Sequence, residues 1–245
     1  MDLRQGDCIE LMKTLPNQSV DLILADLPYN STSISWDQLI PFDLLWEQYK
    51  RILKPKGCVV LFGAQPFTSK LVCSNLDWFK YSLVWDKNKC GSPGLAKIRP
   101  MITHEDILIF APGKTTYNPI MEEGEPYHRK SKNPEGYVSK RNTHGYGLKP
   151  RTEIHNEGTR YPKSIRSVSR DFSAQQQVHP TQKPVPLLRW LIKTYSNEYD
   201  TVLDNVMGSG STGVAAVLEN RNFIGFELNE EYFNLAKERI ESCQI

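Results

Sequence analysis

The sequence predicts an α/β fold with a doubly wound, mostly parallel sheet, and three features indicate it. Residues 19–25 form a nearly continuous apolar run, as in a strand that helices cover on both faces. Residues 42–53 then carry apolar side chains at helical spacing, and a Lys-Pro-Lys-Gly breaker at 54–57 separates that helix from a second apolar run at 58–62. A strand at 201–204 leads into a glycine-rich turn and a helix. Strand, helix and strand joined by short breakers favour parallel pairing with right-handed crossovers.

The remaining elements follow the same alternation, apart from one long interruption. Further strands are expected at 81–85, 106–110 and 223–226, and further helices at 9–15, 184–195, 212–219 and 230–240. From 111 to 178, Gly, Pro, Asn, Ser and basic residues dominate, and an unstructured loop of that length is uncommon inside a compact domain. We therefore expect one domain in two halves, 1–110 and 179–245, separated by a functional insert at 111–178.

Composition and cysteine usage exclude several classes of protein. The 245 residues can bury one sizeable core, and no stretch approaches the roughly 20 apolar residues of a membrane-spanning helix. The N-terminus lacks the apolar run of a signal peptide. Five widely spaced cysteines indicate reduced thiols, and five histidines at no ligand spacing give no reason to expect a metal site. A cytoplasmic protein is expected.

Positive charge is concentrated in the insert. Residues 127–170 hold eleven Lys or Arg and three acids, a net charge of +8 in a chain whose formal net charge is +2. A basic segment on a mildly acidic body suits a polyanion bound through its phosphates. On composition alone, a solvated basic loop explains the segment equally well.

The glycine turn is the first candidate binding site. Gly208, Gly210 and Gly213 form a GxGxxG pattern between a strand and a helix, and Glu227 follows at the end of the next strand. In dinucleotide folds the glycines admit a ligand close to the backbone and the acid binds ribose hydroxyls. The layout predicts an adenosine-containing ligand.

Asp204 narrows the choice of ligand. A carboxylate at the mouth of the glycine turn would repel a pyrophosphate, but it would attract a ligand that carries an ammonium and a sulfonium. S-adenosylmethionine has both charges and no phosphate. The alternative is that Asp204 only caps the turn that follows it.

The tetrapeptide Asp26-Leu27-Pro28-Tyr29 is the candidate catalytic site, because it follows the first buried strand at the edge where parallel sheets place their chemistry. An exocyclic amine of a base is a poor nucleophile until acceptors on its N–H groups free its lone pair. The Asp26 side chain supplies one acceptor, and a main-chain carbonyl such as that of Leu27 supplies the other, in a turn that Pro28 rigidifies. Tyr29 offers a face on which an extruded base stacks. The same four residues also suit an ordinary β-turn.

With these motifs the chain resembles the amino-methylating DNA methyltransferases of the permuted β class, in which the catalytic motif precedes the cofactor motif. The family's Asp/Asn/Ser-Pro-Pro-Tyr/Phe motif is matched at 26–29 except at Leu27, and its Asp-Pro-Phe-x-Gly-Ser-Gly motif is matched at 204–210 except at Asn205 and Val206. The resemblance implies a methyltransferase fold with one antiparallel strand near the sheet edge. It also implies direct in-line methyl transfer from S-adenosylmethionine, without a covalent enzyme intermediate, to a flipped base in DNA.

The resemblance also implies roles for individual residues. Asp26 in first place favours adenine N6 over cytosine N4. Thr181 and Lys183 would bind the methionine carboxylate of the cofactor, and Asp7 with Cys8 its adenine. The full set of expected cofactor contacts is Asp7, Cys8, Asp26, Thr181, Lys183, Asp204, Asn205, Val206, Gly208, Ser209, Gly210 and Glu227.

The halves and the insert acquire roles in the same way. Segment 1–110 becomes the catalytic half, 179–245 the cofactor-binding half and 111–178 the target-recognition region. The expected DNA contacts are Trp36, Arg129, Lys130, Lys140, Arg141, Arg151 and Arg160, although for Trp36 a role as an anchor of the next helix is favoured. The resemblance leaves a homodimer and a partner restriction endonuclease open.

Three other functions remain as alternatives. The GxGxxG pattern with Glu227 also suits an NAD-dependent oxidoreductase, although that reading leaves the segment 26–29 unexplained. The basic insert alone suits a non-catalytic DNA-binding module. Methyl transfer to cytosine N4, or to RNA, is the alternative that the sequence distinguishes least well from transfer to adenine N6 in DNA.

Overall fold

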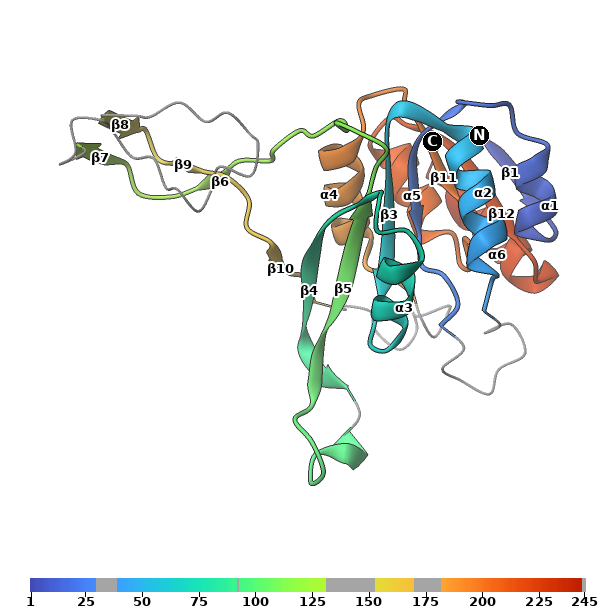
Figure 1. Ribbon diagram of the computed structural model, residues 1–245, viewed down its shortest axis with the longest axis horizontal. Helices are drawn as coiled ribbons and strands as arrows, with labels where there is room; N and C mark the ends of the chain where they lie inside the picture. The colour runs from blue at the N-terminus through green and yellow to red at the C-terminus, as the bar shows by residue number, and fades with distance from the viewer. Residues whose placement is uncertain (30–38, 92, 131–152, 170–181, 244–245) are drawn as a thin grey trace. The chain divides into compact units, whose positions relative to one another are not determined.

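The computed structural model describes residues 1–29, 39–91, 93–130, 153–169 and 182–243. The chain divides into two compact units (Figure 1). Unit 1 combines Met1–Asn118 with Lys163–Ile245, and unit 2 is Pro119–Pro162. Unit 2 falls within the segment 111–178 that was expected as an insert, and the expected division of the chain into two halves and an insert stays a prediction.

Unit 1 is built on a sheet of eight strands within the described residues. In spatial order they are β1 (Asp2–Gln5), β12 (Asn222–Glu227), β11 (Thr201–Asp204), β2 (Val20–Ala25), β3 (Leu53–Gly63), β5 (Ile102–Phe110), β4 (Phe79–Gly91) and β10 (Ile165–Ser167). Among these pairings, β5 runs antiparallel to β3 and β4, and the other neighbours are parallel. The prediction of a mostly parallel sheet with one antiparallel strand near its edge is confirmed.

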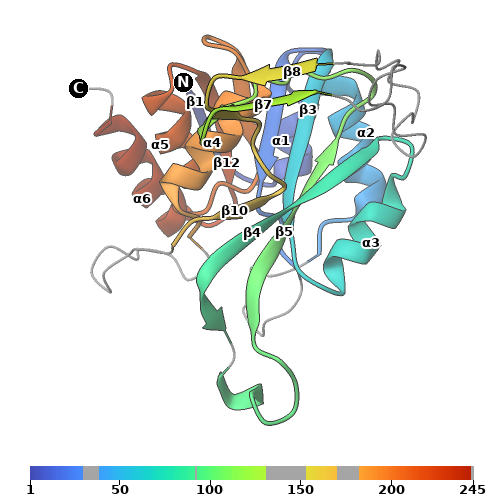
Figure 2. The ribbon, with the colours of Figure 1, turned by 90° about the vertical axis from the view of Figure 1, so that its left-hand side faces the viewer.

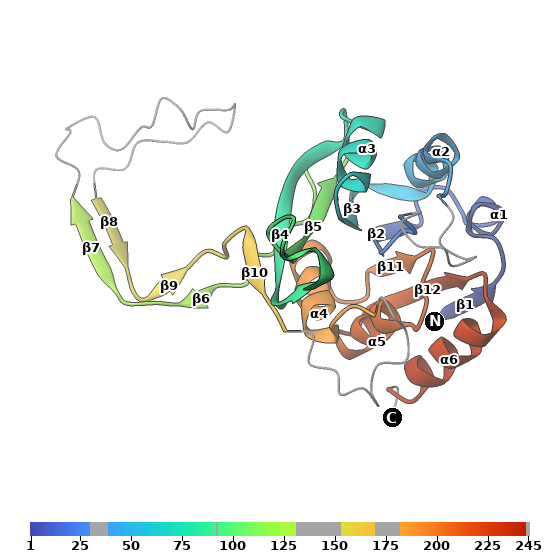
Figure 3. The ribbon, with the colours of Figure 1, turned by 90° about the horizontal axis from the view of Figure 1, so that it is seen from below.

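Helices cover both faces of this sheet (Figure 3). One face carries α1 (Cys8–Lys13), α2 (Phe42–Ile52) and α3 (Phe67–Ser74), and the other carries α4 (Val185–Tyr195), α5 (Ser211–Leu218) and α6 (Glu230–Glu241). The central position of β2 explains its continuous apolar run. Leu22 and Leu24 enter the core beneath α4 and α5, while Ile23 enters the core beneath α1 and α2. Successive side chains of a strand point to opposite faces, so both must be apolar.

The structure adds elements that the pattern did not predict. Helix α3 and the short helix η1 (Pro93–Leu95) were not expected, and β4 with β5 forms a hairpin that continues beyond the sheet (Figure 2). Strand β10 lies inside the predicted insert, yet it pairs with β4 and belongs to unit 1.

Unit 2 consists of two short antiparallel ribbons in its described part. One pairs β6 (Glu122–Glu123) with β9 (Thr159–Arg160), and the other pairs β7 (Tyr127–Lys130) with β8 (Glu153–Asn156). No helix in the described ranges of either unit has the length and apolar character that crossing a bilayer requires.

Candidate active site

The candidate site lies where β2 and β11 end. These strands are parallel neighbours, with Val202 opposite Leu22, so their carboxyl ends meet at one edge of the sheet. Asp26 directly follows β2, and Asp204 is the last residue of β11. The tetrapeptide and the glycine turn are brought together by this pairing, as a site at the carboxyl edge requires.

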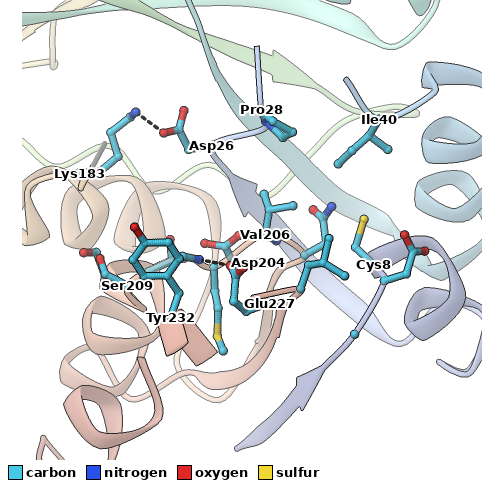
Figure 4. A pocket seen from close by; sticks show the side chains of 18 of the residues that line it. Cys8, Asp26, Pro28, Ile40, Lys183, Asp204, Val206, Ser209, Glu227 and Tyr232 are labelled. Carbon is cyan, nitrogen blue, oxygen red and sulfur yellow. Dashed lines mark hydrogen bonds and ion pairs between the residues drawn. The ribbon is translucent and has the colours of Figure 1, made fainter. Parts of the chain in front are cut away.

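Both segments line a cavity of about 390 Å³ (Figure 4). The expected site residues that line it are Asp7, Cys8, Asp26, Pro28, Lys183, Asp204, Asn205, Val206, Gly208, Ser209 and Glu227. Ile40, Gln182 and Tyr232 line it as well. Gln182 lies between the expected cofactor contacts Thr181 and Lys183, whereas no motif in the sequence pointed to Ile40 or Tyr232. The volume is in the range of small-molecule and cofactor sites.

Glu227 holds the glycine turn in place. The Gly208 N–H donates to Glu227 Oε2 at 2.8 Å, and the Asn229 N–H donates to Oε1 at 2.9 Å. Gly208 has a φ of 50°, a conformation that favours glycine. Burial raises the pKa of Glu227, and the backbone hydrogen bonds oppose that rise. The expected ribose contact of Glu227 stays a prediction, now beside a structural role.

Gly210 does not line the cavity. It has a φ of 77°, and a Cβ atom built there would lie 2.9 Å from Ala236 Cβ on α6. Glycine is required here because α6 approaches closely. The sequence had instead predicted that Gly210 contacts the cofactor.

Asp204 is a buried carboxylate with a weakly acidic character. Burial raises its pKa to about 7, while hydrogen bonds from Thr212 and from the Val206 N–H oppose the rise. The Val206 N–H lies 3.1 Å from Asp204 Oδ1, so the alternative role as a turn cap is observed. Asp26 and Glu227 raise the pKa further through repulsion, which a ligand cation would relieve.

Asp7 and Cys8 stand at the start of α1. Asp7 Oδ1 accepts hydrogen bonds from the N–H groups of Ile9 at 2.9 Å and Glu10 at 3.0 Å, an N-cap that was expected beside a ligand role. Burial raises the pKa of Cys8 to about 11, so its thiol stays protonated at neutral pH and is a poor nucleophile.

Two polar atoms on the cavity wall fit the expected cofactor. Asn205 Nδ2 and Ser211 Oγ are buried without a hydrogen-bond partner among the described residues. Tyr49 Oη donates to Asn205 Oδ1 at 2.6 Å, which leaves the amide nitrogen for an acceptor. A ligand with ring nitrogens and hydroxyls would satisfy these atoms, and one with cationic groups would match Asp204 and Glu227. S-adenosylmethionine has all of these groups.

The candidate catalytic tetrapeptide, residues 26–29, is ordered around Asp26. The Tyr29 hydroxyl donates to Asp26 Oδ1 at 2.8 Å, and the Tyr29 ring stacks on Phe67 with centroids 4.7 Å apart. Phe67 thus covers one face of the ring on which a base was expected to stack. Leu27 is buried, and Pro28 lines the cavity.

Lys183 points at Asp26 (Figure 4) and binds its Oδ2 atom. Its ammonium also lies 3.3 Å from Oε2 of Glu105, a residue that belongs to none of the sequence motifs. Burial raises the pKa of Asp26, Lys183 lowers it and Glu105 raises it again. Lys183 was expected on the methionine carboxylate, and that contact stays a prediction beside the observed ion pairs.

The expected DNA contacts fall into three groups. Arg129 and Lys130 are exposed on β7. Arg160 instead stabilises unit 2, since it donates to the Thr159 carbonyl at 2.9 Å and lies over the Tyr127 ring at 4.8 Å. Trp36, Lys140, Arg141 and Arg151, together with the cofactor candidate Thr181, lie outside the described residues.

This sheet, with its glycine turn and acidic cavity, defines an S-adenosylmethionine-dependent methyltransferase. The family model described as DNA methylase matches residues 20–238. The chain belongs to this DNA methylase family, whose members methylate adenine N6 or cytosine N4. The oxidoreductase and the non-catalytic module are thereby set aside.

Relatives and a solved structure agree with this membership. The chain is 28% identical to the type II methyltransferase M.HinfI of Haemophilus influenzae, over 98% of this chain and 68% of that protein. It is 29% identical to the DNA adenine methyltransferase YhdJ of Escherichia coli K12, over 96% and 81%. The crystal structure of an M1.HpyAVI–SAM complex is similar with a TM-score of 0.64 and 26% identity, over 98% of both chains.

Proposed function

We propose that this DNA methyltransferase acts on N6 of adenine. The observation that carries the proposal is the position of Asp26, whose carboxylate lines the same cavity as the glycine turn. The similarity to YhdJ, which is described as a DNA adenine methyltransferase, supports the same base. Cytosine N4 is the alternative within the family.

Asp26 would act on the amine of the target base. Its carboxylate accepts an N–H of the amine, which frees the nitrogen lone pair for attack. Lys183 and Tyr29 each bind one Asp26 oxygen, and each oxygen keeps a lone pair for the amine. S-adenosylmethionine supplies an electrophilic methyl group on a sulfonium when it is bound. Asp204, Asn205 and Glu227 would hold it, with Asp204 facing its positive charge.

DNA binding and location complete the proposal. Exposed Arg129 and Lys130 of unit 2 contact the phosphate backbone, and the free, buried thiols of Cys8 and Cys58 suit a reducing cytoplasm. Sedimentation of the purified protein tests for a homodimer, and co-purification tests for a partner restriction endonuclease.

The test is the identity of the methylated nucleoside. The protein is incubated with labelled S-adenosylmethionine and either duplex DNA, single-stranded DNA or RNA of the same sequence, and the digested products are separated by mass spectrometry. N6-methyladenine in DNA is expected. N4-methylcytosine, or label in RNA alone, would overturn the proposal.

Asp26→Ala tests the residue. Transfer should fall by about 10²- to 10⁴-fold, the usual contribution of a positioned acid or base, while calorimetry shows nearly unchanged cofactor binding. Lys183 keeps Glu105 as a counter-ion in this variant, so the fold should persist. Asp2→Ala, which removes a half-buried carboxylate that is paired with Arg4 and lies outside the cavity lining, is the control.

A further inference from the structure

Asp26 is one end of a buried chain of four alternating charges. Lys183 binds Asp26 and also lies 3.3 Å from Glu105 Oε2, and Lys87 Nζ lies 3.3 Å from Glu105 Oε1. The side chains of Lys183, Glu105 and Lys87 are only 7%, 10% and 14% exposed. The four residues come from four places in the fold: the end of β2, the segment before α4, and strands β5 and β4.

Such a chain is not explained by stability alone. Desolvating charges is costly, and a buried ion pair seldom stabilises a fold more than apolar side chains of the same volume. A single Lys183–Asp26 pair would already be neutral, so Glu105 and Lys87 add two more desolvated charges without improving that neutrality. A function for the outer pair is the simpler account.

We propose that Glu105 is a positioning residue for methyl transfer: it fixes the Lys183 ammonium, and through Lys183 it fixes the plane of the Asp26 carboxylate that faces the target amine. This inference rests on the proposed role of Asp26. Glu105 acts on the Lys183 ammonium through its charge, because the two groups lie 3.3 Å apart without the geometry of a hydrogen bond. The centroid of the Phe62 ring lies 4.9 Å from the same ammonium, so the two contacts together restrict where it lies beside Asp26.

Glu105 also sets how strongly Asp26 attracts a proton. The charged or titratable groups that act on Asp26 are Tyr29 from its own turn, Lys183, Glu105 and Asp204 of β11. Lys183 lowers the pKa of Asp26 and Glu105 raises it, so the two partners have opposite effects. With Lys183 alone, Asp26 would be a weaker base.

The decisive measurement is the titration of the Asp26 carboxyl carbon by NMR in the free protein. Glu105→Gln keeps the shape of the side chain and removes its charge, so the Asp26 pKa should fall. Lys183→Met should make it rise. Shifts in opposite directions support the network, whereas an unchanged Asp26 titration in both variants would overturn it.

Kinetics then separate positioning from folding. Glu105→Gln should lower kcat by up to about 100-fold, the effect of a small misplacement of a reacting group, and leave the KM for S-adenosylmethionine nearly unchanged. The acid limb of its pH–rate profile should move to lower pH. In the Lys183→Met background the same change should have little further effect on kcat, because Glu105 acts through Lys183.

Glu219→Gln is the matched control. Glu219 is also 10% exposed and is paired with a cation, Arg189, at 2.6 Å. It lies outside the cavity lining, so its substitution should alter stability without moving the Asp26 titration.

If no substrate base is methylated at all, the proposed function fails while the titration still tests the network. If kcat, pH profile and titration of Glu105→Gln match the wild type, the inference fails while the proposed function stands.

Discussion

The Tyr49 hydroxyl donates a 2.6 Å hydrogen bond to Asn205 Oδ1, and this buried contact determines which end of the Asn205 amide is left for the cavity. Burial raises the pKa of Tyr49 well above its usual value, so the hydroxyl remains a donor at every physiological pH. Asn205 departs from the Pro of the family's cofactor motif. In this protein Asn205 is held by a hydrogen bond from Tyr49 on α2.

Tyr49→Phe should therefore weaken cofactor binding. The amide loses the contact that fixes its orientation, and a buried acceptor is left unsatisfied. We expect S-adenosylmethionine affinity to fall about fivefold to tenfold and the free energy of unfolding to fall by about 1–3 kcal/mol. Calorimetry and urea unfolding measure the two effects. Tyr199→Phe, at a residue that is 75% exposed, is the control, and equal affinity in both variants would refute the role of Asn205.

Cofactor affinity should depend on pH through Asp204. Its folded-state pKa of about 7 lies above the ordinary carboxyl value, so the free protein favours the neutral form and loses stability as the pH rises through 7. A cationic ligand favours the ionised form, so affinity for S-adenosylmethionine should increase from about pH 6 to about pH 8 by up to tenfold. Asp204→Asn should bind more weakly and show a smaller increase. An identical increase in that variant would assign the effect to another group.

Gly210→Ala should destabilise the protein even without cofactor. The new Cβ would meet Ala236 on α6, and the backbone conformation is unfavourable for any side chain. A loss of about 1–3 kcal/mol in the free energy of unfolding is expected. Gly94→Ala is the comparison, because a Cβ there meets nothing within 4 Å. Full stability with lost cofactor binding would instead favour the direct ligand contact that the sequence suggested.

Charge removal on β7 should weaken DNA binding without affecting the chemistry. Arg129→Gln combined with Lys130→Gln should lower affinity similarly for all sequences and reduce the slope of log affinity against log salt by about 1 per lost phosphate contact. Fluorescence anisotropy across a salt titration measures this slope. Arg160→Gln should act differently, by loosening unit 2, because the guanidinium binds its own ribbon. An unchanged salt slope in the double variant would place the DNA contacts elsewhere.

The motifs at 26–29 and 204–210 could be predicted because each is local in the chain and lies at the end of an apolar strand. Residues that act across the fold could not. Lys183 and Asp26 are 157 positions apart, and nothing near Glu105 indicates that it shares the same ammonium. Gly210 was interpreted from its motif alone, since its contact with Ala236 depends on how α6 packs. Helix α3 was missed because no capping side chain marks its start, whereas Asp7 marks the start of α1 and the glycine turn marks that of α5.

The chain rejoins the sheet of unit 1 directly after unit 2 ends. The chain leaves unit 1 after Asn118 and re-enters it at Lys163, and β10 then pairs with β4 two residues later. Because the described lining of the cavity comes entirely from unit 1, we expect that the segment 119–162 can be exchanged without altering the cavity. Grafting the corresponding segment of a relative between Asn118 and Lys163 should redirect the enzyme to a new recognition sequence. Unit 1 should still transfer methyl groups in such a chimera.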